Sequence, residues 1–451
     1  MVVLYFLQEV LSTPAVLIAL IAFIGLMLQK APATDVIRGT LKSFLGFILI
    51  GAGAGIIVGA LEPMASMFEK AFNTTGVIPN NEAIIALALR EYGEITALIM
   101  FFGMFANLIL ARLTRLKYVF LTGHHTLYMA CLIGVILITI GFTNTVAIVI
   151  GSVALGLTMI LFPAMAQSTM KKITNTDEVG FGHFSTIGYW ASATIGRIVG
   201  GKNIKSTEDI NFPKSLSFLR DSSVSISITM CIIYIVLTIL AGPAFIHAEL
   251  SGGTNFILYA ITLGITFAAG VFVILQGVRL ILAEIVPAFK GISERLIPGA
   301  RPALDCPVVF PYAPNAVLIG FFSSFIGGII GMAGLIAAGG IIILPGVVPH
   351  FFCGATAGVF GNARGGIRGA VLGAFVNGLL LTFAPLILMP LLGNLGFANT
   401  TFSDLDFIAT GFILGSAGQV APWLVFAVVF GLAGGLIIFN LVAPKKKAKK
   451  E

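Results

Sequence analysis

Residues 118–170 read YVFLTGHHTLYMACLIGVILITIGFTNTVAIVIGSVALGLTMILFPAMAQSTM, and this run contains no Asp, Glu, Lys or Arg. A transmembrane helix needs about 20 mostly apolar residues, so the run is long enough for two spans. Other uncharged runs cover 10–29, 43–61, 95–111, 222–248, 250–278, 306–363, 369–403 and 407–444. With two spans in 118–170, two in 306–363 and one in each of the others, the sequence predicts eleven transmembrane helices. The expected fold class is therefore an all-α polytopic membrane protein.

The overall composition supports a membrane protein. Of the 451 residues, 58% are hydrophobic and 10% are charged, whereas a soluble domain carries about 25% charged residues. This composition excludes an ordinary soluble enzyme, and 4 cysteines are too few for a disulfide scaffold. In a membrane protein the net charge of +7 indicates loop orientation rather than nucleic-acid binding. The chain has no Walker motif, and we expect no cofactor.

The distribution of Lys and Arg predicts which side each loop faces. If the basic tail 444–451 is cytoplasmic, eleven spans place Met1 outside. The cytoplasmic loops then collect 23 of the 26 Lys and Arg residues, as the positive-inside rule requires. We expect one integral membrane unit over 1–451, with inverted halves at roughly 1–200 and 222–443.

The proposed halves rest on a faint internal repeat. Residues 47–70 can be laid on 272–295, and the same shift sets Asn80 on Asp305. The two matched segments are expected to run in opposite directions through the membrane. Inverted repeats of this kind are typical of transporters and place the substrate site near the bilayer midplane.

Two loops rich in helix-breaking residues lie at equivalent places in the repeat, at 74–82 and 297–307. Pro, Gly and Asx stop helices and form turns. Irregular backbone at membrane depth persists only where it lines a protein cavity, so we expect re-entrant loops. The alternative is a pair of ordinary surface loops. Segments 62–73 and 284–297 mix charges with apolar residues at three- and four-residue spacing, which predicts interfacial or hinge helices.

Three histidines interrupt the apolar pattern. His124 and His125 follow Gly123, and His183 follows Gly182. An ionisable group within a membrane segment is costly and indicates a functional site. The alternative is a histidine at the membrane interface that is solvated by water. Metal ligation is less strongly indicated, because no Cys or carboxylate lies at zinc spacing from these residues in the sequence.

The longest motif lies between the second repeat segment and the run that follows it. It reads Gln276-Gly277-Val278-Arg279, Ala283-Glu284, Ala288-Phe289, Gly291-Ile292-Ser293, Arg295-Leu296-Ile297-Pro298-Gly299-Ala300, Asp305-Cys306 and Tyr312-Ala313-Pro314-Asn315-Ala316-Val317. Shorter motifs are Leu121-Thr122-Gly123-His124, Gly182-His183 and Pro345-Gly346 with Pro349. Together they closely resemble the ascorbate-type enzyme II C permeases of the bacterial phosphotransferase system, over nearly the whole chain.

The resemblance implies a homodimeric permease in the bacterial cytoplasmic (inner) membrane. Each protomer would have a V-shaped dimerising domain and a core domain that moves the substrate in an elevator-like manner. The permease is not catalytic alone. A separate B component with a phosphocysteine would phosphorylate L-ascorbate to ascorbate 6-phosphate, and an A component with a phosphohistidine would recharge the B component. The expected partners are thus the sugar, these proteins, a second copy of the chain and the lipid bilayer, with no nucleic acid.

The resemblance also carries over ligand positions. His124, His183 and Asp305 match polar positions of the family's sugar site, and His125 adjoins the first of them. Imidazole and carboxylate groups can hydrogen-bond sugar hydroxyls.

Nearby positions depart from the ascorbate pattern. Tyr128 and Phe184 stand where ascorbate members carry Gln, and Asn81-Glu82 replaces a Thr-Tyr pair. A carboxylate at Glu82 would disfavour an ascorbate anion unless it is protonated or turned away. Aromatic residues in place of the amides would suit a related pentose or alditol that stacks on a ring.

Two other classes remain open at this point. An ion-coupled secondary transporter could use Asp305, Glu82 and the histidines for proton coupling. A membrane scaffold without transport would not need polar loop tips at depth. The state of the delivered solute, phosphorylated or free, separates the first alternative from group translocation.

Overall fold

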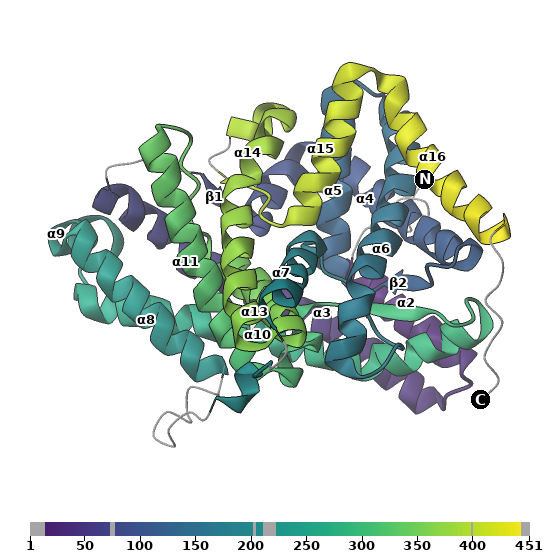
Figure 1. Ribbon diagram of the computed structural model, residues 1–451, viewed down its shortest axis with the longest axis horizontal. Helices are drawn as coiled ribbons and strands as arrows, with labels where there is room; N and C mark the ends of the chain where they lie inside the picture. The colour runs from purple at the N-terminus through teal and green to yellow at the C-terminus, as the bar shows by residue number, and fades with distance from the viewer. Residues whose placement is uncertain (1–13, 73–76, 202–203, 211–221, 398–399, 443–451) are drawn as a thin grey trace.

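The structure is a computed structural model that describes residues 14–72, 77–201, 204–210, 222–397 and 400–442. Met1, Glu451 and the predicted basic tail lie outside the described residues. The chain is largely helical (Figure 1). Its helical elements are α2 (Pro14–Leu28), α3 (Ala33–Phe72), α4 (Asn81–Leu113), α5 (Gly123–Ile140), α6 (Asn144–Thr174), α7 (Thr186–Val199), η1 (Thr207–Asp209), α8 (Ser222–Ala241), α9 (Pro243–Phe245), η3 (Ile246–Leu250), α10 (Phe256–Arg295), η4 (Cys306–Val308), η5 (Phe310–Tyr312), α11 (Pro314–Ala338), α12 (Val347–Pro349), η6 (His350–Gly354), α13 (Ala355–Phe383), α14 (Pro385–Leu388), η7 (Met389–Leu391), η8 (Gly393–Phe397), α15 (Leu405–Val420) and α16 (Pro422–Val442).

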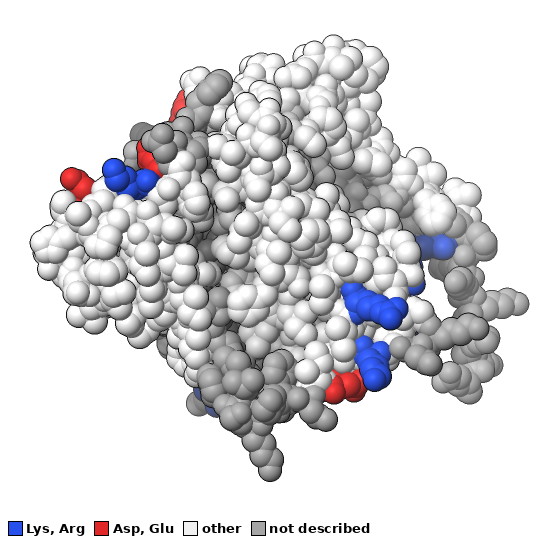
Figure 2. All heavy atoms as spheres, turned by 60° about the vertical axis from the view of Figure 1, so that its left-hand side comes forward, with Lys and Arg blue, Asp and Glu red and all other residues white. Residues whose placement is uncertain are grey.

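Many of these helices have the length and apolarity of membrane spans. Within the described residues seven helices qualify, and eight if α8 is joined to the segment 243–250 across a bend of 99°. Two shorter apolar helices cover Phe256–Gly270 and Leu405–Val420. Figure 2 shows charged side chains mainly at the margins of one face, with a broad uncharged area between them. Such a surface is the one that lipid contact requires.

One predicted span boundary near the C-terminus is wrong. The run 407–444 is predicted as one span, but α15 ends at Val420 and α16 begins at Pro422. The predicted boundary at Arg364 and Arg368 coincides with a break inside α13. The break lies between them at Gly366, whose φ of 57° and ψ of −147° are accessible mainly to glycine.

The helices form two groups around separate hydrophobic cores. In the first group α3 and α10 lie side by side with α2 and α8 against them, and they occupy the lower part of Figure 1. Their shared core includes Met67, Tyr234 and Phe267. The second and larger core is built by α4, α5, α6, α7, α13 and α15. We call these groups the paired-helix half and the site half.

The predicted interfacial segments are not separate helices. Residues 62–73 and 284–297 are mostly the last turns of α3 and α10, which are both 40 residues long. Pro63 lies inside α3 without ending it. The amphipathic pattern therefore marks the ends of two long helices, because the backbone continues without a turn between the apolar and the amphipathic parts.

Short strands accompany the predominantly helical fold. They are β1 (Ile78–Pro79), β2 (Tyr118–Phe120), β3 (Gly180–Phe181), β4 (Arg301–Leu304) and β5 (Thr400–Thr401). One parallel sheet has the order β2-β4-β3, and β1 pairs in parallel with β5. An isolated parallel bridge joins Val77 to Ile343. The strands satisfy the backbone groups of the loops that interrupt the apolar helices, as burial demands.

Glycines allow close helix contacts inside the site half. A Cβ at Gly196 of α7 would lie 2.7 Å from the carbonyl oxygen of Gly361 in α13, and one at Gly320 of α11 would lie 2.5 Å from that of Gly354. Such small-residue contacts are a common way for helices to pack in membranes. They place α13 firmly between α7 and α11.

Candidate functional site

Three parallel strands carry three of the predicted site residues to one place. His124 follows β2 by four residues, His183 follows β3 by two, and Asp305 directly follows β4. The carboxyl ends of parallel strands meet at the same edge of a sheet, so these side chains come together although they are distant in sequence. Gly182 makes the approach possible, because a Cβ there would lie 2.5 Å from the Ala303 carbonyl oxygen.

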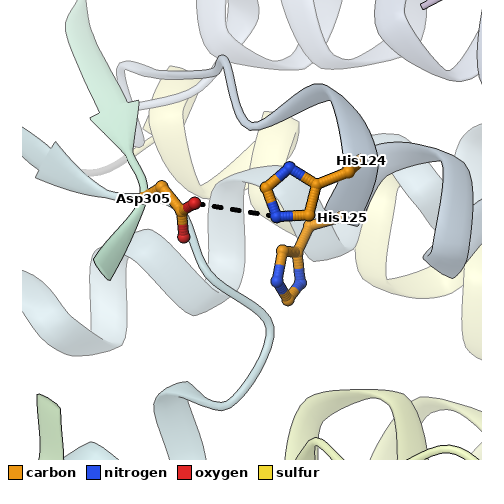
Figure 3. Close-up of side chains that lie close together, drawn as sticks. All are labelled: His124, His125 and Asp305. Atoms are coloured by element: carbon orange, nitrogen blue, oxygen red, sulfur yellow. Dashed lines mark ion pairs between the residues drawn. The ribbon is translucent and has the colours of Figure 1, made fainter. Parts of the chain in front are cut away.

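His124 and Asp305 face each other across this edge (Figure 3). Their closest atoms, His124 Nε2 and Asp305 Oδ2, are 3.6 Å apart, and the side chains are 22% and 15% exposed. The other carboxylate oxygen of Asp305 accepts a hydrogen bond of 2.7 Å from the Cys306 N–H and so caps η4. One oxygen is therefore held by the backbone, while the other remains directed at His124 and partly open.

His183 is held from two sides. Its Nδ1 atom is 2.8 Å from the Tyr189 hydroxyl, and its Nε2 atom is 3.7 Å from Oδ2 of Asp404. One ring nitrogen is therefore bonded to Tyr189 on α7, and the other lies close to Asp404 before α15. These partners restrict both the tautomer and the orientation of the ring.

Asp404 is a buried carboxylate that the sequence analysis did not select. Its Oδ1 accepts hydrogen bonds from Asn81 Nδ2 at 2.9 Å and from Ser403 Oγ at 2.5 Å. The Asn81 amide oxygen in turn accepts from the Ser403 N–H at 3.0 Å. The predicted site residue Asn81 thus reaches the cluster through Asp404, which links it to His183.

A second missed carboxylate, Asp406, caps α7. Its two oxygens accept hydrogen bonds from the backbone N–H groups of Thr186 at 2.8 Å and Ile187 at 2.9 Å. These donors lie at the helix N-terminus, where a carboxylate is favoured. The available signal is the pair Asp404 and Asp406, which lies between two uncharged runs without a basic residue beside it.

His125 packs behind the first pair. It is 3% exposed, its ring stacks on Phe407 at 5.5 Å between centroids, and its centroid is 3.9 Å from that of His183. The Phe184 N–H donates to His125 Nδ1 at 3.3 Å. A neutral imidazole that accepts at Nδ1 carries its proton on Nε2. His125 therefore presents a hydrogen-bond donor to the cluster.

The cluster also contains groups that bind metals in other proteins. Three sets have donor atoms within 4.8 Å of one another, namely His124, His125 and Asp305; His125, His183 and Asp404; and His183, Asp305 and Cys306. The Nε2 proton of His125 removes the lone pair that a metal would need in the first two sets. In the third set His183 Nδ1 bonds Tyr189, so only its Nε2 atom could ligate a metal. In the first two sets the hydrogen bonds thus favour recognition of a hydroxylated ligand.

The remaining predicted site residues lie around the edge of the cluster. Tyr128 is partly buried, with its ring edge-on to His124 at 5.8 Å. The Phe184 ring is fully buried and stacks on Phe120 at 4.5 Å, so it packs in the aromatic core behind His125. Glu82 belongs to the first turn of α4, but its side chain lies outside the described part of the chain.

The comparisons with known proteins identify the class. The family model of the PTS system sugar-specific permease component matches residues 9–406, and the chain belongs to this family. It is therefore a multi-pass membrane protein of the sugar phosphotransferase system. A curated relative, the ascorbate-specific PTS system EIIC component of Mycoplasma pneumoniae, is 27% identical over 428 residues. That match covers 83% of this chain and 64% of the relative, so the chain spans less than two thirds of the relative's length.

Proposed function

We propose that this chain is a phosphotransferase permease that binds L-ascorbate, or a closely related sugar or alditol, and moves it inward. A separate B component with a phosphocysteine would phosphorylate the bound sugar, and L-ascorbate would emerge as ascorbate 6-phosphate. An A component would recharge the B component. The observation that carries this proposal is the convergence of His124, His183 and Asp305 at the ends of three parallel strands.

The chemistry of the cluster supports a polyhydroxylated ligand. His124 and His183 can donate to or accept from hydroxyl groups, and the open oxygen of Asp305 can accept a hydroxyl proton. We include His125 and Asn81 as neighbouring polar groups, and Glu82 as the next residue after Asn81. Tyr128 completes the proposed site with an aromatic ring, and the buried Phe184 ring supports His125 from behind. Sugar sites combine polar groups with aromatic faces in this way.

Several features support two inverted repeats. Helices α3 and α10 have equal lengths, with an offset of 223 residues from Ala33 to Phe256 and from Phe72 to Arg295. This offset differs by two residues from the shift of the sequence repeat, which sets Asn80 on Asp305. Each is followed by a strand, β1 or β4. The strand β4 pairs with β2 and β3, and the β1 region pairs with Ile343 and β5. Each half therefore supplies one strand that pairs with two segments of the other half, as a pseudo-twofold relation requires.

The same division supports an elevator mechanism in a homodimer. In this proposal the paired-helix half is the V-shaped dimerising domain, and the site half is the core domain that carries the sugar. All hydrogen bonds and ion pairs described above for the cluster lie within the site half. The site half can therefore move without breaking them. We further propose eleven spans, with the N-terminus outside and the C-terminus in the cytoplasm.

Reconstituted transport tests the proposal. Vesicles that hold the chain would be supplied with external labelled ascorbate and an internal phosphorylated B component of an ascorbate phosphotransferase system. We expect internal ascorbate 6-phosphate in wild type and a strong loss in His124→Ala. Asp35→Asn, which alters an exposed pair with Arg38, serves as the control with unchanged transport. Free ascorbate accumulated by a proton gradient without the B component would instead establish ion-coupled transport.

A further inference from the structure

A group of basic residues gathers where α6, α7 and α13 end or break. We call it the basic patch. It consists of Lys171, Lys172, Arg197, Lys205, Arg364 and Arg368. In the predicted topology all of them face the cytoplasm.

Hydrogen bonds bring these residues into one surface. Arg364 donates to the Ser168 carbonyl oxygen and, through Nε, to Thr169 Oγ1 at 3.2 Å. Lys172 Nζ is 3.4 Å from the Ala363 carbonyl oxygen. The last turn of α6 is therefore tied to the break in α13.

The segment 204–210 adds Lys205 to the same surface. The Ile367 N–H donates to the Lys205 carbonyl oxygen at 2.9 Å, and Asn362 Oδ1 accepts from the Thr207 N–H at 2.9 Å. Arg197 lies in the last turn of α7, which packs on the same stretch of α13 through Gly196 and Gly365. Four separate segments thus place their cations around one helix break.

The positive charge of the patch is largely uncompensated. Among the described residues, no ion pair involves Lys171, Arg197, Lys205 or Arg368. The neighbouring acids are engaged with backbone groups. The Glu208 carboxylate accepts from the Asn315 N–H at 3.0 Å at the start of α11.

Asp209, the next acid, is engaged in the same way. It accepts from the Ser206 N–H at 2.8 Å and closes a capping box. The acids therefore hold the segment 204–210 in place, and the cations remain available to a partner.

Apolar side chains are exposed among these cations. Ile198 is 77% exposed and Ile204 is 48% exposed. A protein interface commonly has an apolar centre surrounded by a polar rim. The positive-inside rule accounts for cations on this side of the membrane, but it requires neither their clustering nor the exposed isoleucines between them.

We propose that the basic patch is the docking surface for the phosphorylated B component, an inference that rests on the proposed function. The phosphorylated partner carries added negative charge, which complements the unpaired cations of the patch, while its phosphoryl group is directed toward the sugar. Helix α7 connects the two places. It begins beside His183 and Asp406 and ends at Arg197, and its 14 residues span about 21 Å at roughly 1.5 Å per residue.

The location of the patch on the site half supports this occupant. Helices α6, α7 and α13 belong to the same packed core as the sugar cluster. A partner docked there would keep its position relative to the bound sugar when the site half moves. A partner bound to the paired-helix half would change its position relative to the sugar.

The test measures sugar phosphorylation by full-length protein in neutral-lipid vesicles, with purified phosphorylated B component as the probe. The variant combines Lys171→Glu, Arg197→Glu and Arg368→Glu. We expect its KM for the B component to rise at least about ten-fold at low salt, because charge reversal at an interface slows association. The difference should shrink in high salt, where surface charges are screened. Binding of sugar without the B component should remain unchanged, which shows that the variant is folded.

Two controls make the result specific. Arg112→Glu makes the same change at an exposed residue outside the patch and should leave the KM unchanged, whereas Arg197→Glu alone should raise it. The paired variant Arg197→Lys with Arg368→Lys keeps the charge and should behave like wild type. A triple variant whose KM stays within two-fold of wild type would overturn the docking surface. An effect seen only with anionic lipid would overturn it as well, in favour of a lipid contact. Absence of phosphorylation in wild type would instead refute the proposed function.

Discussion

Tyr189→Phe tests whether the surroundings of His183 are organised for sugar binding. The substitution removes one hydroxyl and keeps the ring, which packs against Phe181 and Phe360. In wild type that hydroxyl is 2.8 Å from His183 Nδ1, and both side chains are buried. If Tyr189 donates to Nδ1, the His183 proton resides on Nε2. Loss of the hydroxyl leaves Nδ1 without its partner and releases the ring from that tautomer.

The expected size of the effect follows from this one contact. A buried group left without its hydrogen-bond partner costs about 1–3 kcal/mol. Part of this cost lowers the free energy of unfolding. The other part weakens the free energy of sugar binding, because His183 must be reoriented when the sugar binds. A share of about 1 kcal/mol in the complex corresponds to a roughly five-fold weaker Kd. We therefore expect a Kd for ascorbate at least about five-fold higher than in wild type.

The measurement pairs sugar binding in detergent with thermal unfolding. Tyr234→Phe is the matched control, because the buried Tyr234 hydroxyl donates to the Ala60 carbonyl oxygen in the paired-helix half. Both variants should unfold at lower temperature, but only Tyr189→Phe should bind sugar more weakly. Equal loss of stability with unchanged affinity in Tyr189→Phe would refute the view that His183 is held in position for the sugar.

Further expectations concern charge, specificity and topology. Asp305→Asn should weaken sugar binding at least about five-fold, the loss of one charged hydrogen bond, while the yield of folded protein in detergent stays unchanged. Tyr128→Gln restores an amide and should strengthen ascorbate binding roughly two- to ten-fold, as measured by titration. Phe184→Gln places an amide within the aromatic core and should lower the free energy of unfolding by about 3 kcal/mol or more, measured by chemical denaturation. Single cysteines at the two chain ends, in a cysteine-free background, should react with an impermeant reagent from opposite sides; labelling from one side would contradict eleven spans.

The sequence pointed to the main site residues because polar groups stand out against an apolar pattern. His124 and His183 interrupt that pattern, Asp305 lies in a loop of helix-breaking residues, and all three match positions of the family's sugar site. The structure brings them together. The short strands that align them were not predicted. Strands of two to four residues are too short for an alternating pattern to emerge from uniformly apolar sequence. The residues were thus visible from sequence, but their arrangement required the strand pairing.

Helix α7 escaped prediction for a related reason. Its first N–H groups bond Asp406, 220 residues away from Thr186, whereas the side chain of the local N-cap residue Ser185 makes no capping hydrogen bond. A tertiary contact therefore supplies the cap that local sequence rules assign to a neighbouring residue. The charges at Arg364 and Arg368, by contrast, mark the break of α13 at Gly366.

The site combines side chains from the two halves of the sequence, residues 1–200 and 222–443. His124 from the first half faces Asp305 from the second, and His183 and Asn81 from the first half face Asp404 from the second. The strands β2 and β3 follow the same rule in pairing with β4. A carboxylate or imidazole at membrane depth is costly unless it has a partner. Some partners lie in the same half, as Tyr189 does for His183, but both imidazole–carboxylate pairs join one half to the other. These pairs form only when both halves are folded together, which ties the presence of a sugar site to completion of the interleaved fold.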